Sequence, residues 1–197
     1  SKMVVRPIAG FLHIIVYAGF VIINIEVLEI IIDGLFGTHR VLSLLGPLYD
    51  FLIGGFELLA LGVLLACVAF LVRREGLRLK RFWMKEMDGW PRSDASIILF
   101  TEIALMTAFL TMNAADLTLQ ERGADHYIQA GAFPVSGFIV PLLYGLRTTG
   151  LIIVERACSW FHIIGILAFL NSLPYSKHFH IQLAFPNTFY SNHYPKT

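Results

Sequence analysis

The chain has 197 residues, of which 56% are hydrophobic and 15% charged, and its formal net charge is only +1. In soluble domains about a quarter of the residues are charged, so this composition excludes an ordinary soluble domain and predicts a chain embedded in membrane lipid. The near-neutral charge balance gives no electrostatic basis for binding nucleic acid. The two cysteines, Cys67 and Cys158, lie far apart in apolar stretches and form neither a cluster-binding motif nor a disulfide framework.

Four apolar stretches have about the 20 residues that a membrane-crossing helix needs. They cover residues 8–35, 47–72, 96–117 and 151–173. Runs such as IILFTEIALMTAFLTM lack the alternation that marks a barrel strand, so we predict an all-α, polytopic membrane helix bundle. A fifth apolar stretch, residues 132–146, is short and is interrupted by Pro134 and Pro141. We expect it to form a re-entrant or interfacial segment.

Basic residues predict the orientation of these spans. The connection at residues 73–95 contains seven lysines and arginines, whereas residues 34–46 and 118–150 contain few. Short loops rich in lysine and arginine stay on the cytoplasmic side of a membrane. We therefore expect a multi-pass protein of the cell's inner (cytoplasmic) membrane, with the basic loop and both termini in the cytoplasm.

Histidines on the first and last spans indicate a bound cofactor. His162 and His180 are 18 residues apart, which is five turns of an ideal helix, so both would point the same way about 27 Å apart. Two ligands so placed cannot share one metal, but each can hold one of two haems against a ligand from another helix. We expect His13 to pair with His180 across one haem, with His178 as an alternative ligand or propionate partner.

A second haem needs a partner for His162, and His39 is the one histidine near that end of the first span. An uninterrupted helix would place His39 about 39 Å from His13. The pair with His162 therefore requires the chain to fold back, which Gly34 and Gly37 would allow. Because an imidazole buried in lipid is costly without a partner, several histidines at matching depths favour ligation over simple packing.

Carboxyl residues recur in the predicted spans: Glu26, Glu29 and Asp33 in the first, Glu57 in the second and Glu102 in the third. The three in the first span follow the spacing i, i+3, i+7 and so share one helical face. Ionisable groups in membranes often relay protons, so we interpret this face as a proton path beside an outer quinol site. The alternative is that Glu26 or Glu29 pairs with a buried arginine such as Arg156.

The residues from Glu155 onward resemble the end of the membrane domain of iron–sulfur-binding reductases related to heterodisulfide reductase, most specifically in the runs SKHFHI and PNTFY. Two further runs resemble the same family: RPIAGFLHIIVYAGFVIINIEVLEIIIDGLFGTHR and FWMKEMDGWPRSDASIILFTEI. In that family a cytochrome-b-like bundle, similar to the gamma subunit of respiratory nitrate reductase, precedes a cytoplasmic iron–sulfur domain. The resemblance implies haem b held by histidines that match His13, His162 and His180, and electron exchange between a membrane quinone and cytoplasmic clusters.

The chain departs from the family pattern in two respects. Asn24 stands near the position where the gamma subunit has a second histidine on its first haem helix, so the resemblance implies one or two haems. The cluster-binding cysteines are absent, so iron–sulfur clusters would belong to a missing domain or a partner subunit. We therefore expect residues 1–181 to form a haem-binding transmembrane bundle and residues 182–197 a linker toward a cytoplasmic iron–sulfur domain. The resemblance also implies a further membrane helix upstream.

On these grounds the sequence predicts the membrane part of a quinone-linked oxidoreductase, in which a b-type cytochrome transfers electrons between a quinone pool and an iron–sulfur reductase domain. One alternative is a proton-conducting or transporter-like bundle, against which the absence of visible internal repeats counts. The other alternative is a haem-free membrane anchor. The presence of haem would distinguish the first hypothesis from the two alternatives.

Overall fold

The computed structural model describes residues 7–76, 90–175, 183 and 190. Most of them belong to four long α-helices: α1 (Pro7–Phe36), α2 (Pro47–Leu71), α3 (Trp90–Glu121) and α5 (Thr148–Ser172). Shorter helical pieces connect or extend these helices: η1 (Val41–Leu45), η2 (Val72–Gly76), η5 (Ser136–Phe138), α4 (Val140–Leu143) and η6 (Leu173–Tyr175). For this part of the chain the predicted all-α fold is confirmed.

Each of the four long helices contains a stretch that is long and apolar enough to cross a membrane, as predicted. Large apolar side chains cover much of their outer surface; Phe51, for example, is 76% exposed. Contiguous apolar surface of this kind is typical of a protein that faces lipid. The bundle therefore has the exterior of a polytopic membrane protein.

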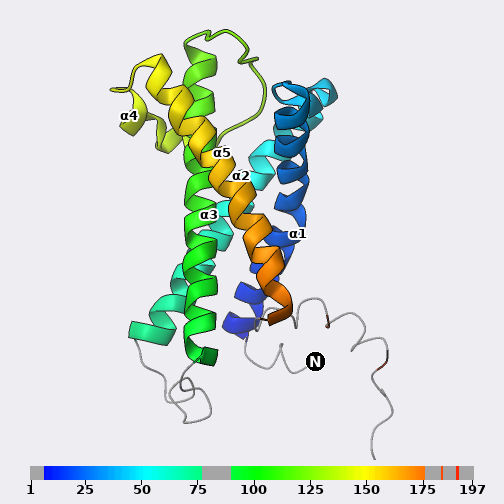
Figure 1. Ribbon diagram of the computed structural model, residues 1–197, viewed down its shortest axis with the longest axis vertical. Helices are drawn as coiled ribbons and strands as arrows, with labels where there is room; N and C mark the ends of the chain where they lie inside the picture. Colours follow the sequence, from blue (N-terminus) through cyan, green and yellow to red (C-terminus); the bar gives the residue numbers. More distant parts are fainter. Residues whose placement is uncertain (1–6, 77–89, 176–182, 184–189, 191–197) are drawn as a thin grey trace, which may run out of the picture.

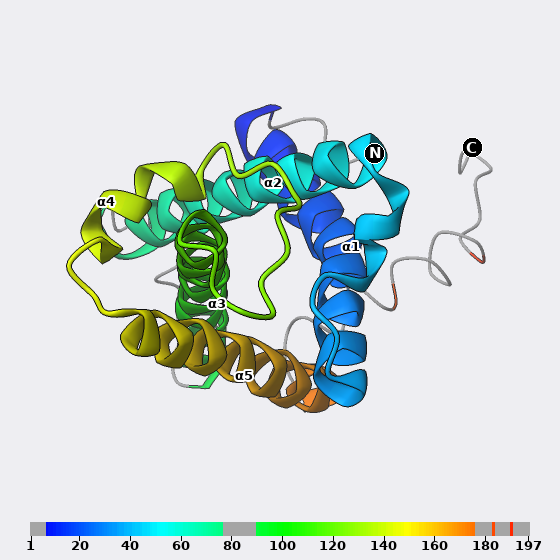
Figure 2. The same ribbon diagram turned by 90° about the horizontal axis from the view of Figure 1, so that it is seen from above.

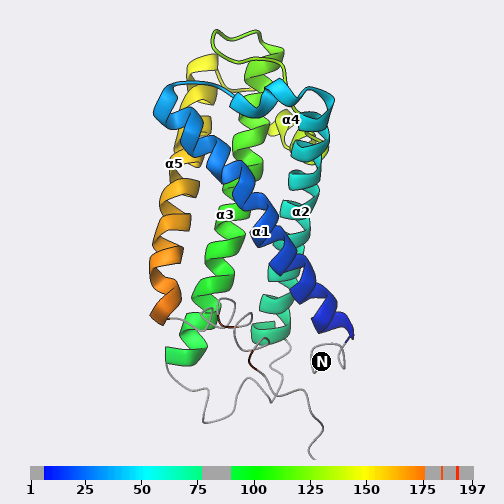
Figure 3. The same ribbon diagram turned by 90° about the vertical axis from the view of Figure 1, so that its right-hand side faces the viewer.

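The four long helices differ in how closely they pack against one another. The closest pairings join α3 to α5, α1 to α2, and α2 to α3, whereas α1 and α5 make few contacts with each other. Figures 1 and 2 show α3 next to both α2 and α5. Figure 3 shows α1 crossing the bundle obliquely. As a result, the side of the bundle between α1 and α5 is the least tightly closed.

The short segment after α3 does not cross the bundle. Its helical pieces, η5 and α4, are only three and four residues long and pack on α3. Pro141 lies in the first turn of α4, where its missing N–H has no helical partner to lose. The prediction of a short non-crossing segment at residues 132–146 is confirmed.

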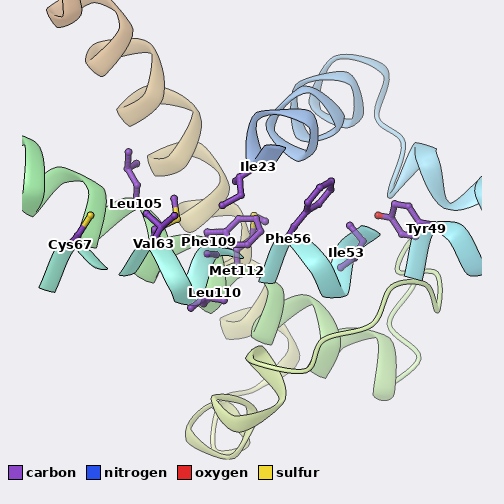
Figure 4. Close-up of a cluster of buried hydrophobic side chains, with 12 residues drawn as sticks. Ile23, Tyr49, Ile53, Phe56, Val63, Cys67, Leu105, Phe109, Leu110 and Met112 are labelled. Atoms are coloured by element: carbon purple, nitrogen blue, oxygen red, sulfur yellow. The ribbon is translucent and has the colours of Figure 1, made fainter. Parts of the chain in front are cut away.

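The hydrophobic core lies between α1, α2 and α3 (Figure 4). Ile53 on α2 and Phe109 on α3 are fully buried, and Ile23 on α1 packs with them. The hydroxyl of Tyr49 lies at one end of this cluster, where the apolar core gives way to buried polar side chains.

The end of α5 lies close to residue 173, where the fourth span was predicted to end. The α-helix ends at Ser172, and residues Leu173–Tyr175 continue as a single 3-10 turn. Pro174 lies inside that turn, and because proline has no N–H it cannot continue an α-helix. His180 lies outside the described residues, so its register relative to His162 stays a prediction.

Candidate functional site

His162 on α5 is fully buried, with 0% of its surface exposed. Its Nδ1 lies 3.2 Å from the carbonyl oxygen of Leu105 on α3. A carbonyl oxygen can only accept a hydrogen bond, so Nδ1 carries the proton and Nε2 of the neutral imidazole keeps its lone pair. This Nε2 is buried and has no hydrogen-bond partner among the described residues. His162 therefore offers Nε2 as a metal ligand or as a hydrogen-bond acceptor.

His162 lines a cleft bounded by α1, α2, α3 and α5. The α1 wall includes Val16 and Asn24, and Glu102 on α3 adds a second polar side chain. The other lining residues are apolar or glycine. A mostly apolar pocket with a few convergent polar groups is typical of cofactor sites. Leu105 lies near the middle of α3, so the cleft lies at mid-height in the bundle.

Two glycines let helices approach each other closely around this cleft. A Cβ atom at Gly19 of α1 would collide with Val63 of α2, and a Cβ atom at Gly165 of α5 would lie 2.6 Å from Cδ2 of Leu105. Leu105 is also the residue whose carbonyl oxygen holds His162. The close approach of α5 to α3 at Gly165 therefore supports the orientation of the imidazole.

The other predicted ligands of the first and last spans are only partly located. His13 belongs to α1, three residues before Val16 of the cleft wall, but its side chain lies outside the described residues. His178 and His180 also lie outside the described residues. The pairing of His13 with His180 therefore stays a prediction.

His39 is not brought together with His162. Its Nε2 lies 3.0 Å from Oδ1 of Asp116, and its Nδ1 accepts a hydrogen bond of 3.3 Å from the backbone N–H of Ile128. Asp116 is eleven residues beyond Leu105 on α3, which corresponds to about 16 Å along the helix axis. Because both ring nitrogens already have protein partners at another level of the bundle, His39 joins the loops at the end of α3.

Arg40, next to His39, is the centre of a buried polar network. Its Nε donates to Oδ2 of Asp116 at 2.8 Å, its Nη2 to Oδ1 of Asn113 at 3.0 Å, and its Nη1 to the hydroxyl of Tyr49 at 3.1 Å. The guanidinium also lies over the ring of Phe133, 5.0 Å from its centre. Burial alone would lower the pKa of Arg40, but the surrounding charges, that of Asp116 foremost, hold this pKa well above its usual value. Arg40 therefore stays charged and ties α2 and α3 to the connection after α1.

The acids of α1 lie at this same end of the bundle. Glu29 accepts hydrogen bonds from the hydroxyl of Tyr49 at 3.0 Å and from the backbone N–H of Leu42 at 2.9 Å. Asp33 accepts one from the backbone N–H of Arg40 at 2.7 Å. Both carboxyl groups thus fix the turn between α1 and η1, so two of the three residues predicted to form a proton path have structural partners.

Glu26, the third acid of this face, is 1% exposed, and its two carboxyl oxygens have no hydrogen-bond partner among the described residues. The nearest cation is Nη1 of Arg40, 3.6 Å from Oε1. A buried arginine does lie beside Glu26, as the alternative prediction stated, but it is Arg40 and not Arg156. Arg156 is half exposed and lies 3.2 Å from Glu155 on its own helix.

Glu57, fully buried on α2, anchors the loop that follows α3. It accepts hydrogen bonds from the backbone N–H groups of Val135 at 2.9 Å and Ser136 at 3.1 Å, and from the hydroxyl of Ser136. Asn113 of α3 donates a further hydrogen bond of 3.2 Å. These bonds close one end of the bundle by joining α2, α3 and the short segment.

The sequence analysis did not identify Arg40, Asn113 or Asp116 as parts of a site. Two signals were nevertheless present. Arg40 is an isolated basic residue between two apolar spans, and Asn113, Asp116 and Gln120 repeat on α3 the i, i+3, i+7 spacing of the α1 acids. Two polar faces of the same spacing, near the same end of the first and third spans, indicate a shared network.

A comparison with curated proteins finds similarity to the probable iron-sulfur-binding oxidoreductase FadF of Bacillus subtilis (strain 168), at 27% identity over 194 residues. The match covers 97% of this chain and 25% of that protein, so the chain spans about a quarter of the length of the curated relative it matches. No family model and no solved structure matches the chain. The similarity supports a relationship to iron–sulfur oxidoreductases, while the cytochrome-b-like character stays a prediction.

Proposed function

We propose that this bundle transfers electrons between a membrane quinone and an iron–sulfur domain on the cytoplasmic side of the inner membrane, and that His162 holds a haem b for this purpose. The observation that carries the proposal is the buried Nε2 of His162, which has its lone pair available because Nδ1 is held by Leu105. The similarity to a probable iron-sulfur-binding oxidoreductase supports an electron-transfer role.

The residues around the cleft fit a haem b in their chemistry, because His162 offers a free imidazole nitrogen and the walls are mostly apolar. A haem b, when bound, supplies one-electron chemistry at a potential that depends on its ligands and burial. The carbonyl of Leu105 fixes the imidazole tautomer and makes Nε2 a better electron-pair donor. The apolar walls exclude water from the ligand. The weak contact between α1 and α5 favours entry of a planar group on that side.

His13 is the first candidate for a second histidine that would hold the haem together with His162. It belongs to α1, which forms one wall of the cleft, and it lies three residues before the lining residue Val16. His180 and His178 are the alternatives that the resemblance leaves. A single haem requires one of these three imidazoles in addition to His162.

The quinone and the iron–sulfur partner complete the proposed reaction. A quinone dissolved in lipid can approach the apolar exterior of the helices, and the clusters belong to a domain beyond residues 182–197 or to a separate subunit. Because the chain matches a quarter of its curated relative, the remainder of such a protein is where the clusters are proposed to lie.

The proposal is tested by the reduced-minus-oxidised visible spectrum of the purified protein, which should contain a b-type α-band. His162→Ala should remove the band. His126→Ala, which changes an exposed histidine of the loop after α3, should keep it. A wild-type protein without the band after expression with haem supplied, or a His162→Ala variant with unchanged haem content, would contradict the proposal.

The same spectrum identifies the opposing ligand and the electron donor. The variants His13→Ala, His178→Ala and His180→Ala are compared with His162→Ala. The one of these three that also loses haem identifies the second ligand. A soluble quinol analogue added to membranes should reduce the b-type band. A transporter-like bundle or a haem-free anchor would show neither the band nor its reduction.

A further inference from the structure

The end of the bundle that contains Arg40 carries more buried acid than base. The buried carboxyl groups there come from three helices: Glu26 and Glu29 from α1, Glu57 from α2 and Asp116 from α3. Arg40 is the one buried guanidinium in this group. Even with His39 protonated, ionisation of all four acids would leave two uncompensated negative charges. Buried charges without partners are strongly disfavoured, so this cluster must hold at least one proton.

Hydrogen-bond donors show which acid holds the proton, since a donor stabilises the ionised form. Asp116 has Arg40 and His39 as partners, Glu57 has backbone and side-chain donors, and Glu29 has two donors. Glu26 alone of the four has no hydrogen-bond partner among the described residues, although it is 1% exposed. Its neutral form is therefore the most favoured of the four.

The charged groups that face Glu26 reinforce this assignment. They are Arg40 from the loop, Glu29 from its own helix, Glu57 from α2 and Asp116 from α3. Arg40 favours the ionised form, but its closest contact is with Asp116, at 2.6 Å, against 3.6 Å to Glu26. The three carboxyl neighbours oppose a further negative charge at Glu26.

We propose that Glu26 is a proton-binding site that is occupied at neutral pH. Glu26 takes up or releases its proton when the redox state of the neighbouring cleft changes. Glu26 lies between Asn24 and Val27 of α1, both of which line the cleft that contains His162. An electron added in the cleft raises the affinity of a nearby carboxyl group for its proton, and removal of the electron lowers it. The exchange makes or breaks only the carboxyl O–H bond, and the proton comes from or goes to water at the Arg40 end. The coupling to electrons rests on the proposed function, whereas the proton site itself does not.

Infrared spectroscopy of the purified protein in H₂O and D₂O tests the proton site. At neutral pH the wild-type protein should show the carbonyl band of a protonated carboxyl group, with a shift on deuteration. Spectra are compared in a Glu102→Gln background, so that the carboxyl group of the cleft does not contribute. In that background Glu26→Gln should remove the band, and the matched control Glu29→Gln should retain it.

Three outcomes would overturn the assignment. They are the absence of a protonated-carboxyl band from the Glu102→Gln protein at neutral pH, survival of the band in Glu26→Gln, and its loss in Glu29→Gln alone. The first of these is decisive even if Glu26→Gln fails to fold. In haem-containing protein the midpoint potential should depend on pH and should lose that dependence in Glu26→Gln. A protein without haem would refute the proposed function while the infrared result still decides the proton site.

Discussion

Arg40 shows how a single side chain can define one end of a membrane bundle. It is 7% exposed, yet it bonds to side chains from α2 and α3 and is itself held by Asp33 of α1. Such a residue is costly to bury and is tolerated because each of its three side-chain nitrogens donates a hydrogen bond to a buried side chain. Its sequence position gave a partial signal, since an isolated arginine between two apolar spans needs a partner. Its partners on α3 could not be predicted, because they lie more than 70 residues away in the sequence.

Arg40→Gln should destabilise the protein by about 3–5 kcal/mol, because it leaves the Asp116 carboxylate buried without its cation. Arg156→Gln is the matched control. Its side chain is half exposed, so the change should be within about 0.5 kcal/mol. Thermal unfolding of the detergent-solubilised variants measures both effects. Equal unfolding midpoints for the two variants would contradict a central role for Arg40.

At the scale of the elements, apolar length predicted the four long helices and most of their ends, but not the start of α3. All four spans were expected, because only an α-helix satisfies the backbone within lipid. The predicted third span began at residue 96, but α3 begins at Trp90, because a helix continues into polar sequence until something interrupts it. The end of α5 agrees with the predicted span, which ended at residue 173, because Pro174 cannot continue an α-helix.

The crossing of α1 and α2 depends on a small residue at the point of contact. Gly19→Ala should destabilise the protein by about 1–3 kcal/mol, since the new methyl group would collide with Val63, a buried β-branched side chain with little freedom to move. Gly34→Ala on the same helix is the control, because no atom lies within 4 Å of the added Cβ. That change should be neutral or stabilise the helix by up to about 1 kcal/mol. Thermal unfolding distinguishes the two, and a stable Gly19→Ala variant would show that the helices can separate at this point without cost.

The whole molecule combines two polar sites at different heights in an apolar bundle. The cleft with His162 lies near the middle of α3, and the network around Arg40 lies about 16 Å farther along the same helix. The sequence predicted that His162 would pair with His39, whereas the structure places His162 near the middle of α3 and His39 beside Asp116. The sequence could not predict that His39 belongs to the Arg40 network, because a loop conformation, not helical periodicity, decides its direction. Three helices, α1, α2 and α3, contribute residues to both sites and so link them physically.

The orientation of this molecule in the membrane can be tested independently of its cofactor. We expect the end with Arg40 to face away from the cytoplasm, because the basic loop at residues 73–95 lies at the opposite ends of α2 and α3. In a variant with Cys67 and Cys158 replaced by alanine, a membrane-impermeant thiol reagent added to intact cells should label Asp125→Cys, in the loop after α3. Arg81→Cys, in the basic loop, should react only after the membrane is permeabilised. The reverse pattern would place the Arg40 network on the cytoplasmic side. The proton of Glu26 would then exchange with the cytoplasm, so electron transfer through the cleft would no longer release it across the membrane.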